Sequence, residues 1–359
     1  MELLSVTMND GVKPRSEIEG KDNSSEDKSN YKIVHKGDMV YNSMRMWQGA
    51  NGISPCDGIV SPAYTVLMPK QEINNGYFAA LFKSANLINE FRKNSQGMTS
   101  DTWNLKYPQI ETIKVQIPSV SEQDKVSELF GVLDARIASQ AQLVESLKKY
   151  KRGLVSQILK QRLAISHEDN EWKEVCLSDV AEGFEYGLNA AATVYDGKHK
   201  YIRITDIDDD THTYINQDPV SPSGAFEERY RVRENDILFA RTGASVGKSY
   251  LYRKNDGDLF FAGFLIRIHV KEGVDGEYVF LNTLTEEYDK WVLLESARSG
   301  QPGINAEQYR KYRFKLPSLN TQRRIATIAR NIDVQIQKEA LHLRLLQKQK
   351  VGLLQQLFI

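Results

Sequence analysis

Apolar residues recur at alternating steps of four and three from Val126 and Phe130 to Ile158, with Glu, Gln, Lys, Ser and Arg between them. This heptad period is typical of a long helix that packs lengthwise on another helix. We therefore predict a helix of about 40 residues, roughly 60 Å long, over residues 121–162. A capping box is expected at its start, formed by Ser121 and the acidic residue three positions later.

The same pattern returns 199 residues later, including its polar exceptions: Gln140 returns as Glu339 and Lys151 as Lys350. Two unrelated coiled-coil helices would share the period but not its exceptions, so we infer an internal repeat. The two helices are predicted to pair antiparallel about a pseudo-twofold axis, with Gln140 meeting Glu339. The predicted pairing positions are Val126, Phe130, Leu133, Ile137, Gln140, Leu147 and Leu154 in the first helix and Ile325, Ile332, Ile336, Glu339, Leu346 and Leu353 in the second.

Each long helix follows a stretch that reads as short strands, turns and one helix. In the first stretch we predict strands at 31–35, 39–43, 59–68 and 113–117 and a helix at 76–95. The corresponding segments of the second stretch are 235–239, 260–270 and 276–299. Each stretch is therefore expected to form a mixed α/β globule.

The repeat divides the chain into four parts. We predict a first globule over 1–118, a central long helix over 119–163, a second globule over 164–317 and a C-terminal long helix over 318–359. The predicted fold class is α+β: two mixed α/β globules joined by two long helices that form an antiparallel coiled coil.

The second globule opens earlier than the first. Trp172–Ala181 has no counterpart in the first globule, because Met1 aligns near Lys200. We therefore expect the first globule to be N-terminally shortened. It should expose the apolar surface that such an opening segment would cover.

Composition limits the class of protein. The chain has 359 residues, 41% of them hydrophobic, without an apolar run long enough to span a membrane or a secretion signal. Cys56 and Cys176 are too few for a disulfide framework or a cysteine zinc site, and the histidines show no metal-binding spacing. We expect a cytoplasmic protein that binds no metal.

Charge does not identify a nucleic-acid binder from the whole chain, because 47 Lys and Arg balance 47 Asp and Glu. The charge is local instead. An acidic turn occupies 206–210, and a basic run follows it, made of Arg229, Arg231, Arg233, Arg241, Lys248, Arg253 and Lys254.

Three stretches imitate catalytic motifs without completing them. Gly243–Ser249 resembles a phosphate-binding loop but has one residue too few between its glycines. Ser61–Tyr64 approaches the motif of amino-methyltransferases, yet the chain contains no Gly-x-Gly. Glu19–Lys21 could end a nuclease carboxylate cluster but lies in a Ser- and Asp-rich loop. We predict no catalytic residue and no cofactor.

The opening Trp-Lys-x-Val-x-Leu-x-Asp-Val at Trp172 and the Pro-Ser-x-x-x-Gln entries at Pro118 and Pro317 mark a family. With two globule-plus-helix units, the chain resembles the specificity subunit of type I restriction-modification enzymes over essentially its whole length. The resemblance implies that each globule is a target recognition domain for one half of a bipartite double-stranded DNA site. It also implies helices that set the half-site spacing and dock methyltransferase subunits, with restriction subunits joining them. Catalysis would belong to those partner subunits.

Candidate DNA contacts lie in loops at the same point of both repeats. Arg can read guanine and Gln or Asn can read adenine by paired hydrogen bonds, and glycines let the backbone approach phosphate. The candidates are Arg45, Trp47, Gln48 and Asn51 in the first globule and Arg241, Thr242, Ser245, Lys248, Ser249, Gln301 and Asn305 in the second.

One alternative from another class remains open: a coiled-coil adaptor that binds proteins and not specific DNA sequences. The balanced net charge is compatible with it. Binding to random duplex DNA that weakens as salt rises separates the two hypotheses.

Overall fold

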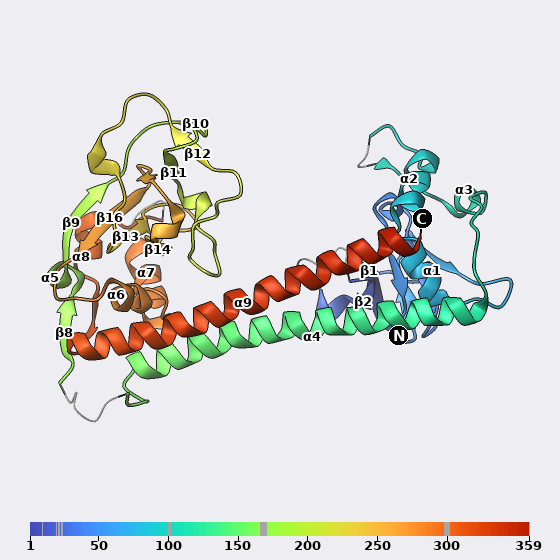
Figure 1. The fold of residues 1–359 in the computed structure, drawn as a ribbon, viewed down its shortest axis with the longest axis horizontal. Coiled ribbons are helices and arrows are strands. Elements are labelled where there is room, and N and C mark those ends of the chain that lie inside the picture. Colours follow the sequence, from blue (N-terminus) through green and yellow to red (C-terminus); the bar gives the residue numbers. More distant parts are fainter. Residues whose placement is uncertain are drawn as a thin grey trace. The chain divides into compact units, whose positions relative to one another are not determined.

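The computed structural model divides the chain into two compact units (Figure 1). Unit 1 comprises Met1–Val144 and Lys338–Ile359, and unit 2 comprises Glu145–Gln337. The structure describes residues 1–8, 10–18, 20, 22, 24–99, 102–165, 171–297 and 302–358.

Two long helices, α4 (Val120–Leu159) and α9 (Leu319–Leu357), contribute a part to each unit. In unit 1 the first part of α4 runs antiparallel to the last part of α9, so that Phe130 stacks on Phe358 with ring centroids 6.1 Å apart. In unit 2 the last part of α4 packs on the first part of α9, with Val155 and Ile325 in one apolar core. The predicted antiparallel coiled coil is confirmed. The predicted pairing positions are all buried or half-buried.

Polar contacts between the helices follow the repeat. Gln140 Nε2 donates to Glu339 Oε2 at 2.7 Å, so the predicted meeting of these residues is confirmed. Lys151 Nζ lies 2.6 Å from Asp333 in unit 2. One repeat later, Lys350 pairs with the carboxylate of Asp134 in unit 1.

The start of α4 differs from the prediction. Ser119 caps it, with its backbone N–H 3.1 Å and its hydroxyl 2.8 Å from the Glu122 carboxylate. The capping box predicted at Ser121 is therefore wrong by two residues. The actual pair has the same spacing and lies directly after Pro118, where the helix can begin earlier.

Besides its parts of α4 and α9, the described residues of unit 1 form two sheets and three short helices. One sheet has the order β2-β1-β6-β3 and the other the order β5-β4-β7. The strands are β1 (Glu2–Val6), β2 (Val12–Pro14), β3 (Lys32–Val34), β4 (Met39–Asn42), β5 (Asn51–Ile53), β6 (Gly58–Val60) and β7 (Tyr64–Leu67). The helices are α1 (Asn75–Leu81), α2 (Ala85–Asn94) and α3 (Tyr107–Ile110), with 3-10 turns at η1 (Arg15–Glu17) and η2 (Met46–Gln48).

Unit 2 repeats this plan with additions. Among the described strands, its largest sheet has the order β14-β13-β16-β9. Three separate two-stranded sheets are formed by β11-β15, β10-β12 and β17-β8. The strands are β8 (Lys173–Cys176), β9 (Ala181–Tyr186), β10 (Ala192–Val194), β11 (Lys200–Ile202), β12 (Val220–Pro222), β13 (Asp236–Ala240), β14 (Ser249–Leu251), β15 (Leu259–Phe261), β16 (Leu265–Val270) and β17 (Arg313–Leu316). The helices are α5 (Leu177–Val180), α6 (Gly276–Asn282), α7 (Glu286–Ser296) and α8 (Ala306–Arg310), with 3-10 turns at η4 (Ile204–Asp206), η5 (Glu228–Tyr230) and η6 (Lys254–Asp256).

Strand registers confirm the internal alignment. In unit 1, β1 runs parallel to β6 with Leu4 opposite Val60. In unit 2, β11 runs parallel to β15 with Ile202 opposite Phe261. Leu4 and Ile202 therefore hold equivalent places in the two units, which share this register.

Several predicted elements are wrong in detail. The strand predicted at 59–68 is two strands, β6 and β7, in different sheets, because Tyr64 N–H donates to Ser61 O and closes a turn. The helix predicted at 76–95 breaks into α1 and α2, where the Ser84 hydroxyl caps α2. Residues 113–117, predicted as a strand, carry none.

The second unit breaks at the same places. The strand predicted at 260–270 is divided between β15 and β16, and the helix predicted at 276–299 between α6 and α7. Leu265 N–H donates to Ala262 O there, which closes a turn like that at Ser61. Both units therefore depart from the prediction at equivalent points of the repeat.

Candidate nucleic-acid interface

The two predicted loops of unit 2 lie against each other. Thr242 pairs with Gly303 in an antiparallel bridge, and Ile304 N–H donates to Arg241 O at 2.9 Å. The loop after β13 and the segment before α8 therefore form one surface.

Arg241 is the cation of this surface that remains available. Its guanidinium lies 4.8 Å from the ring centroid of Tyr186, which is 43% exposed. Within the described part of the chain it forms no ion pair. Arg241 is half-buried, and an arginine over an aromatic ring can still donate hydrogen bonds from its planar guanidinium. The sequence argument missed Tyr186, which belongs to the distant strand β9.

Other predicted residues of this loop have structural partners. Lys248 Nζ donates to Ile207 O at 3.0 Å and pairs with Asp209. The buried hydroxyl of Ser249 lies 2.6 Å from that of Thr283. A nucleic acid would have to displace these contacts before it could reach either side chain.

The remaining predicted residues of unit 2 differ in exposure. Thr242 and Ser245 are half-buried, whereas Asn305 is exposed. The Asn305 side chain accepts from Gln308 N–H at 2.9 Å and so caps α8. Gln301 lies outside the described residues.

The matching loop of unit 1 is built on tryptophan. Trp47 meets Trp103 edge to face with centroids 5.1 Å apart, and the Arg92 guanidinium lies 5.8 Å from the Trp47 ring. Arg45 is exposed at the start of η2, and Gln48 at its end is half-buried. Trp103 lies in residues 95–104, a weaker candidate segment from the sequence, whereas Arg92 was missed because it lies outside both predicted segments.

Asn51 is buried and does not face this surface. Its Nδ2 donates to Gly49 O at 3.1 Å, which closes the loop from the inside. Gly49 has φ of 82°, a left-handed conformation that glycine adopts without strain. A base contact by Asn51 would need the loop to open.

The two loops occupy the same backbone position with different chemistry. Arg241 N–H donates to Phe264 O, and Ser43 N–H donates to Ala63 O in unit 1. Ser43 O accepts from Leu105 N–H just as Arg241 O accepts from its partner. The structural counterpart of Arg241 is therefore the buried Ser43, so the two surfaces cannot read DNA with the same side chain.

Half-buried titratable groups lie behind both loops. Burial lowers the pKa of the His212 imidazole, whose Nδ1 is 2.8 Å from Ser249 O. Burial also lowers the pKa of the Lys83 ammonium, with the nearby charge of Lys350 acting in the same direction. Both shifts are toward the neutral form of the side chain.

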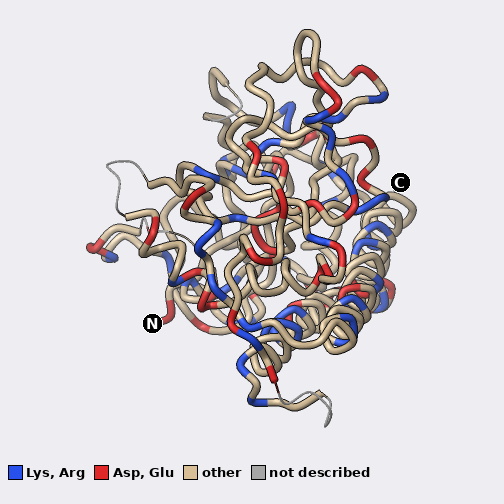
Figure 2. Tube along the Cα trace, turned by 90° about the vertical axis from the view of Figure 1, so that its left-hand side faces the viewer, with Lys and Arg blue, Asp and Glu red and all other residues tan. Residues whose placement is uncertain are grey.

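Most of the basic run is neutralised within the chain. Arg231 pairs with Glu228 at 2.7 Å, Lys254 pairs with Glu234 at 2.9 Å, and Arg253 pairs with Glu277. Figure 2 shows Lys and Arg interspersed with Asp and Glu along the chain. The basic run therefore does not give a continuous positively charged surface for DNA.

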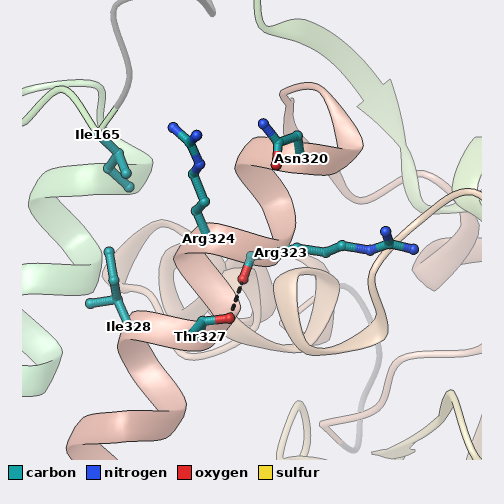
Figure 3. Close-up of a pocket in the computed structure, with 6 residues that line it drawn as sticks. All are labelled: Ile165, Asn320, Arg323, Arg324, Thr327 and Ile328. Carbon is teal, nitrogen blue, oxygen red and sulfur yellow. Dashed lines mark hydrogen bonds between the residues drawn. The ribbon is translucent and has the colours of Figure 1, made fainter.

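A shallow hollow lies at the start of α9 (Figure 3). The guanidinium groups of Arg323 and Arg324 point away from each other there, so they do not converge on one anion. Thr327 Oγ1 donates back to Arg323 O at 2.7 Å. Over the described residues, no group of three or more His, Cys, Asp or Glu could hold a metal ion.

The Gln of each Pro-Ser-x-x-x-Gln entry anchors a long helix to its unit. Gln123 Nε2 donates to Pro118 O at 2.9 Å, and its Oε1 accepts from Asn74 N–H at 3.0 Å. In unit 2, Gln322 makes the same two bonds, to Pro317 O at 2.8 Å and from Asp275 N–H at 2.9 Å. Both glutamines are almost completely buried.

Comparisons with known proteins identify the family. The model of the type I restriction modification DNA specificity domain matches residues 5–149 and 169–344. The chain belongs to this family.

The type I restriction enzyme StySPI specificity subunit of Salmonella potsdam is 25% identical over 284 residues, or 74% of this chain. The alignment spans 59% of that relative's length.

Two solved structures share the fold. A chain from a type I R-M system aligns with a TM-score of 0.58 at 16% identity, over 92% of this chain and 83% of that one. The S subunit of the type I restriction-modification system from M. genitalium aligns with a TM-score of 0.56 at 15% identity, over 91% and 84%. Among the helices of the described residues, none is long and apolar enough to cross a membrane.

Proposed function

We propose that the chain is the DNA sequence-recognition subunit of a type I restriction-modification complex. The observation that carries the proposal is the surface formed by Arg241–Gly243 with Pro302–Ile304. It presents an arginine that lies over an aromatic ring and, among the described residues, has no acidic partner. Arginine in this state can donate two hydrogen bonds to guanine, the commonest specific contact in the major groove. Unit 1 would read the other half-site with Arg45 and the Trp47 cluster.

The long helices would serve as spacer and docking surface. Large apolar side chains are exposed along both, which favours a protein partner over solvent. These residues are Leu129, Val132, Leu143 and Tyr150 in α4 and Val334, Leu341, Leu345 and Val351 in α9. The partners we propose are methyltransferase subunits, with restriction subunits joining them. Methylation and cleavage would belong to those subunits.

The functional division that we propose follows the repeat. Residues 1–118 and 164–317 would be the two target recognition domains, and 119–163 and 318–359 the two spacer helices. A cytoplasmic location stays a prediction.

The test uses the full chain with its methyltransferase partner and a duplex library with random half-sites. We expect selection of one bipartite sequence and affinity that falls as salt rises. Arg241→Ala should weaken binding to the selected site by about 1–3 kcal/mol and relax preference at one base pair. Arg241→Lys is the matched control, because it keeps the charge but loses the paired donors.

Two outcomes would contradict the proposal. Equal affinity for selected and random duplex would favour the protein adaptor. Full specificity in Arg241→Ala would move the reading function to another surface. Lys248 stays a predicted phosphate contact. Because Lys248 pairs with Asp209, Lys248→Ala should reduce the slope of log affinity against log salt concentration by less than about one.

A further inference from the structure

The main sheets of the two units end differently. In unit 2, β16 pairs with β13 on one side and with β9 on the other. In unit 1, β7 is the counterpart of β16, since Tyr41 opposite Thr65 matches Phe239 opposite Ile266. Among the described strands, β7 pairs only with β4 and stands at the edge of its sheet.

Ladder alternation shows which groups face this edge. Ser43 N–H donates to Ala63 O, so Thr65 and Leu67 also direct their backbone groups toward β4. Val66 and Met68 must then direct theirs outward. Their counterparts in unit 2, Arg267 and His269, lie opposite Glu185 and Glu182 of β9. The outward-facing backbone groups of Val66 and Met68 therefore correspond to the groups of unit 2 that pair with β9.

A second edge lies in residues 113–117. Their counterpart in unit 2 is β17, which pairs antiparallel with β8, Phe314 opposite Val175. Residues 113–117 form no strand, and Val115, the counterpart of Phe314, is 38% exposed. A strand-like sequence remains irregular here because no described strand pairs with it.

One lysine protects part of the open edge. In unit 2, Gly187 N–H donates to Leu265 O. The counterpart of that carbonyl in unit 1, Tyr64 O, accepts from Lys32 Nζ. Lysine is a common guard of open sheet edges, and an exposed ammonium can move aside for a backbone donor.

We propose that the open edge of unit 1 binds an extended polypeptide segment similar to residues 172–187, with a strand that pairs with residues 113–117, a turn, and a strand that pairs with β7. The chemistry of the occupant follows from unit 2, where residues 172–187 hold the equivalent place. Val175, Leu177 and Phe184 of that segment lie inward, in or against the apolar core. Main-chain hydrogen bonds would supply affinity, and these alternating apolar side chains would supply selectivity. This interaction does not require DNA and is independent of the proposed function.

The probe is a synthetic peptide of residues 171–187, added to the full chain without DNA. We expect saturable binding, and backbone amide exchange slowed at least about tenfold at residues 64–68 and 113–117. Exchange at 265–270 should not change, because β9 already covers that strand. A scrambled peptide of the same composition should not slow exchange at either edge.

Two changes test the geometry. In unit 2, Glu185 lies opposite Arg267, the counterpart of Val66. A peptide N-methylated at the backbone nitrogen of Glu185 therefore lacks the donor that would face Val66, and it should bind about tenfold more weakly. Val66→Pro removes an outward N–H while leaving the pairing with β4 intact, and should weaken binding similarly. The methylated peptide leaves the protein unchanged, so the test holds even if Val66→Pro fails to fold.

Three results would overturn the proposal. One is unchanged exchange at both edges with millimolar peptide. Another is equal binding of the methylated and unmodified peptides. The third is self-association of the chain that protects residues 64–68 without peptide, which would assign the edge to a second copy.

Discussion

Units 1 and 2 share a frame and differ in what surrounds it. Both anchor a long helix through a buried glutamine, Gln123 or Gln322, with the same two hydrogen bonds. Only unit 2 carries β8 and β9 among the described residues. As a result the equivalent of an inner strand in unit 2, β16, is an edge strand in unit 1, β7. The frame fixes where the candidate DNA-contact loops lie, and the added strands change which side chains support those loops.

The candidate DNA-contact surface of unit 2 depends on its added strand. Arg241 is held by Tyr186 of β9, and Tyr186 also accepts a hydrogen bond from Ala306 N–H at 3.3 Å. Without β9, an arginine at this position would lose its aromatic support. Unit 1 has the small Ser43 there and relies on Trp47 against Trp103. The two loops therefore differ in the residues they carry, and this difference accompanies the presence of β9 beside the loop of unit 2.

The largest effect should come from weakening β9. Phe184 is 8% exposed, belongs to the core of unit 2 and lies under the Arg310 guanidinium at 4.3 Å. Phe184→Ala should lower the free energy of unfolding of unit 2 by about 3 kcal/mol, through lost burial and the cavity left behind.

The four tryptophans allow each unit to be followed separately. In a Trp47→Phe/Trp103→Phe background only Trp172 and Trp291 of unit 2 report urea unfolding by fluorescence. The reciprocal background should show an unchanged transition for unit 1. A shift of both transitions by the same amount would mean that the units unfold together.

The glutamine anchors should give equal effects in both units. Gln123→Ala and Gln322→Ala each remove two hydrogen bonds, which are part-buried in unit 1 and buried or part-buried in unit 2. We expect a loss of about 2–3 kcal/mol in the unit concerned, measured by the same urea transitions. The two losses should agree within about 0.5 kcal/mol, because the contacts match. Unequal losses would show that the shared frame is stabilised differently in the two units.

Sequence periodicity predicted the long helices well because one stripe of apolar residues decides their packing. It failed at 59–68, where an apolar run crosses the Ser61 turn and enters a second sheet. It failed again at 113–117, because a strand needs a partner and alternation alone does not supply one. The glutamine entries were visible as a motif, but their double hydrogen bonds became clear only in three dimensions.

The candidate site was predictable only in part. Recurrence of a Gly-rich loop at one point of the repeat located Arg45, Trp47 and Arg241. It could not reveal that Tyr186 supports Arg241, since the two lie far apart in the chain. Nor could residue type show that Ser249 turns inward.

Buried tyrosines give a smaller effect that separates the units. Tyr309 donates its hydroxyl to Ala240 O at 2.8 Å inside unit 2. Tyr309→Phe should cost about 1 kcal/mol, because that carbonyl loses one of its two donors and keeps the Gly247 N–H. Burial raises the pKa of Tyr41 in unit 1, whose hydroxyl faces Thr65 but makes no hydrogen bond of ordinary geometry.

The matched change in unit 1 is Tyr41→Phe, which installs the residue that unit 2 already has at this position, Phe239. It should alter the free energy of unfolding of unit 1 by less than about 0.5 kcal/mol, or stabilise the unit. A cost equal to that of Tyr309→Phe would show that the Tyr41 hydroxyl has a partner after all.

The smallest effect concerns the repeated ion pair between the long helices. Lys151 and Asp333 of unit 2 are 16% and 31% exposed, whereas Lys350 and Asp134 of unit 1 are 19% and 54% exposed. Water and salt screen the more exposed pair more strongly. A double-mutant cycle with alanine should therefore give a coupling of about 0.5–1 kcal/mol in unit 2 and less than half of that in unit 1. Raising the salt concentration should lower both couplings. A larger coupling in unit 1 would mean that exposure of the carboxylate does not govern these pairs, and that the two ends of the coiled coil differ in a way the repeat does not reveal.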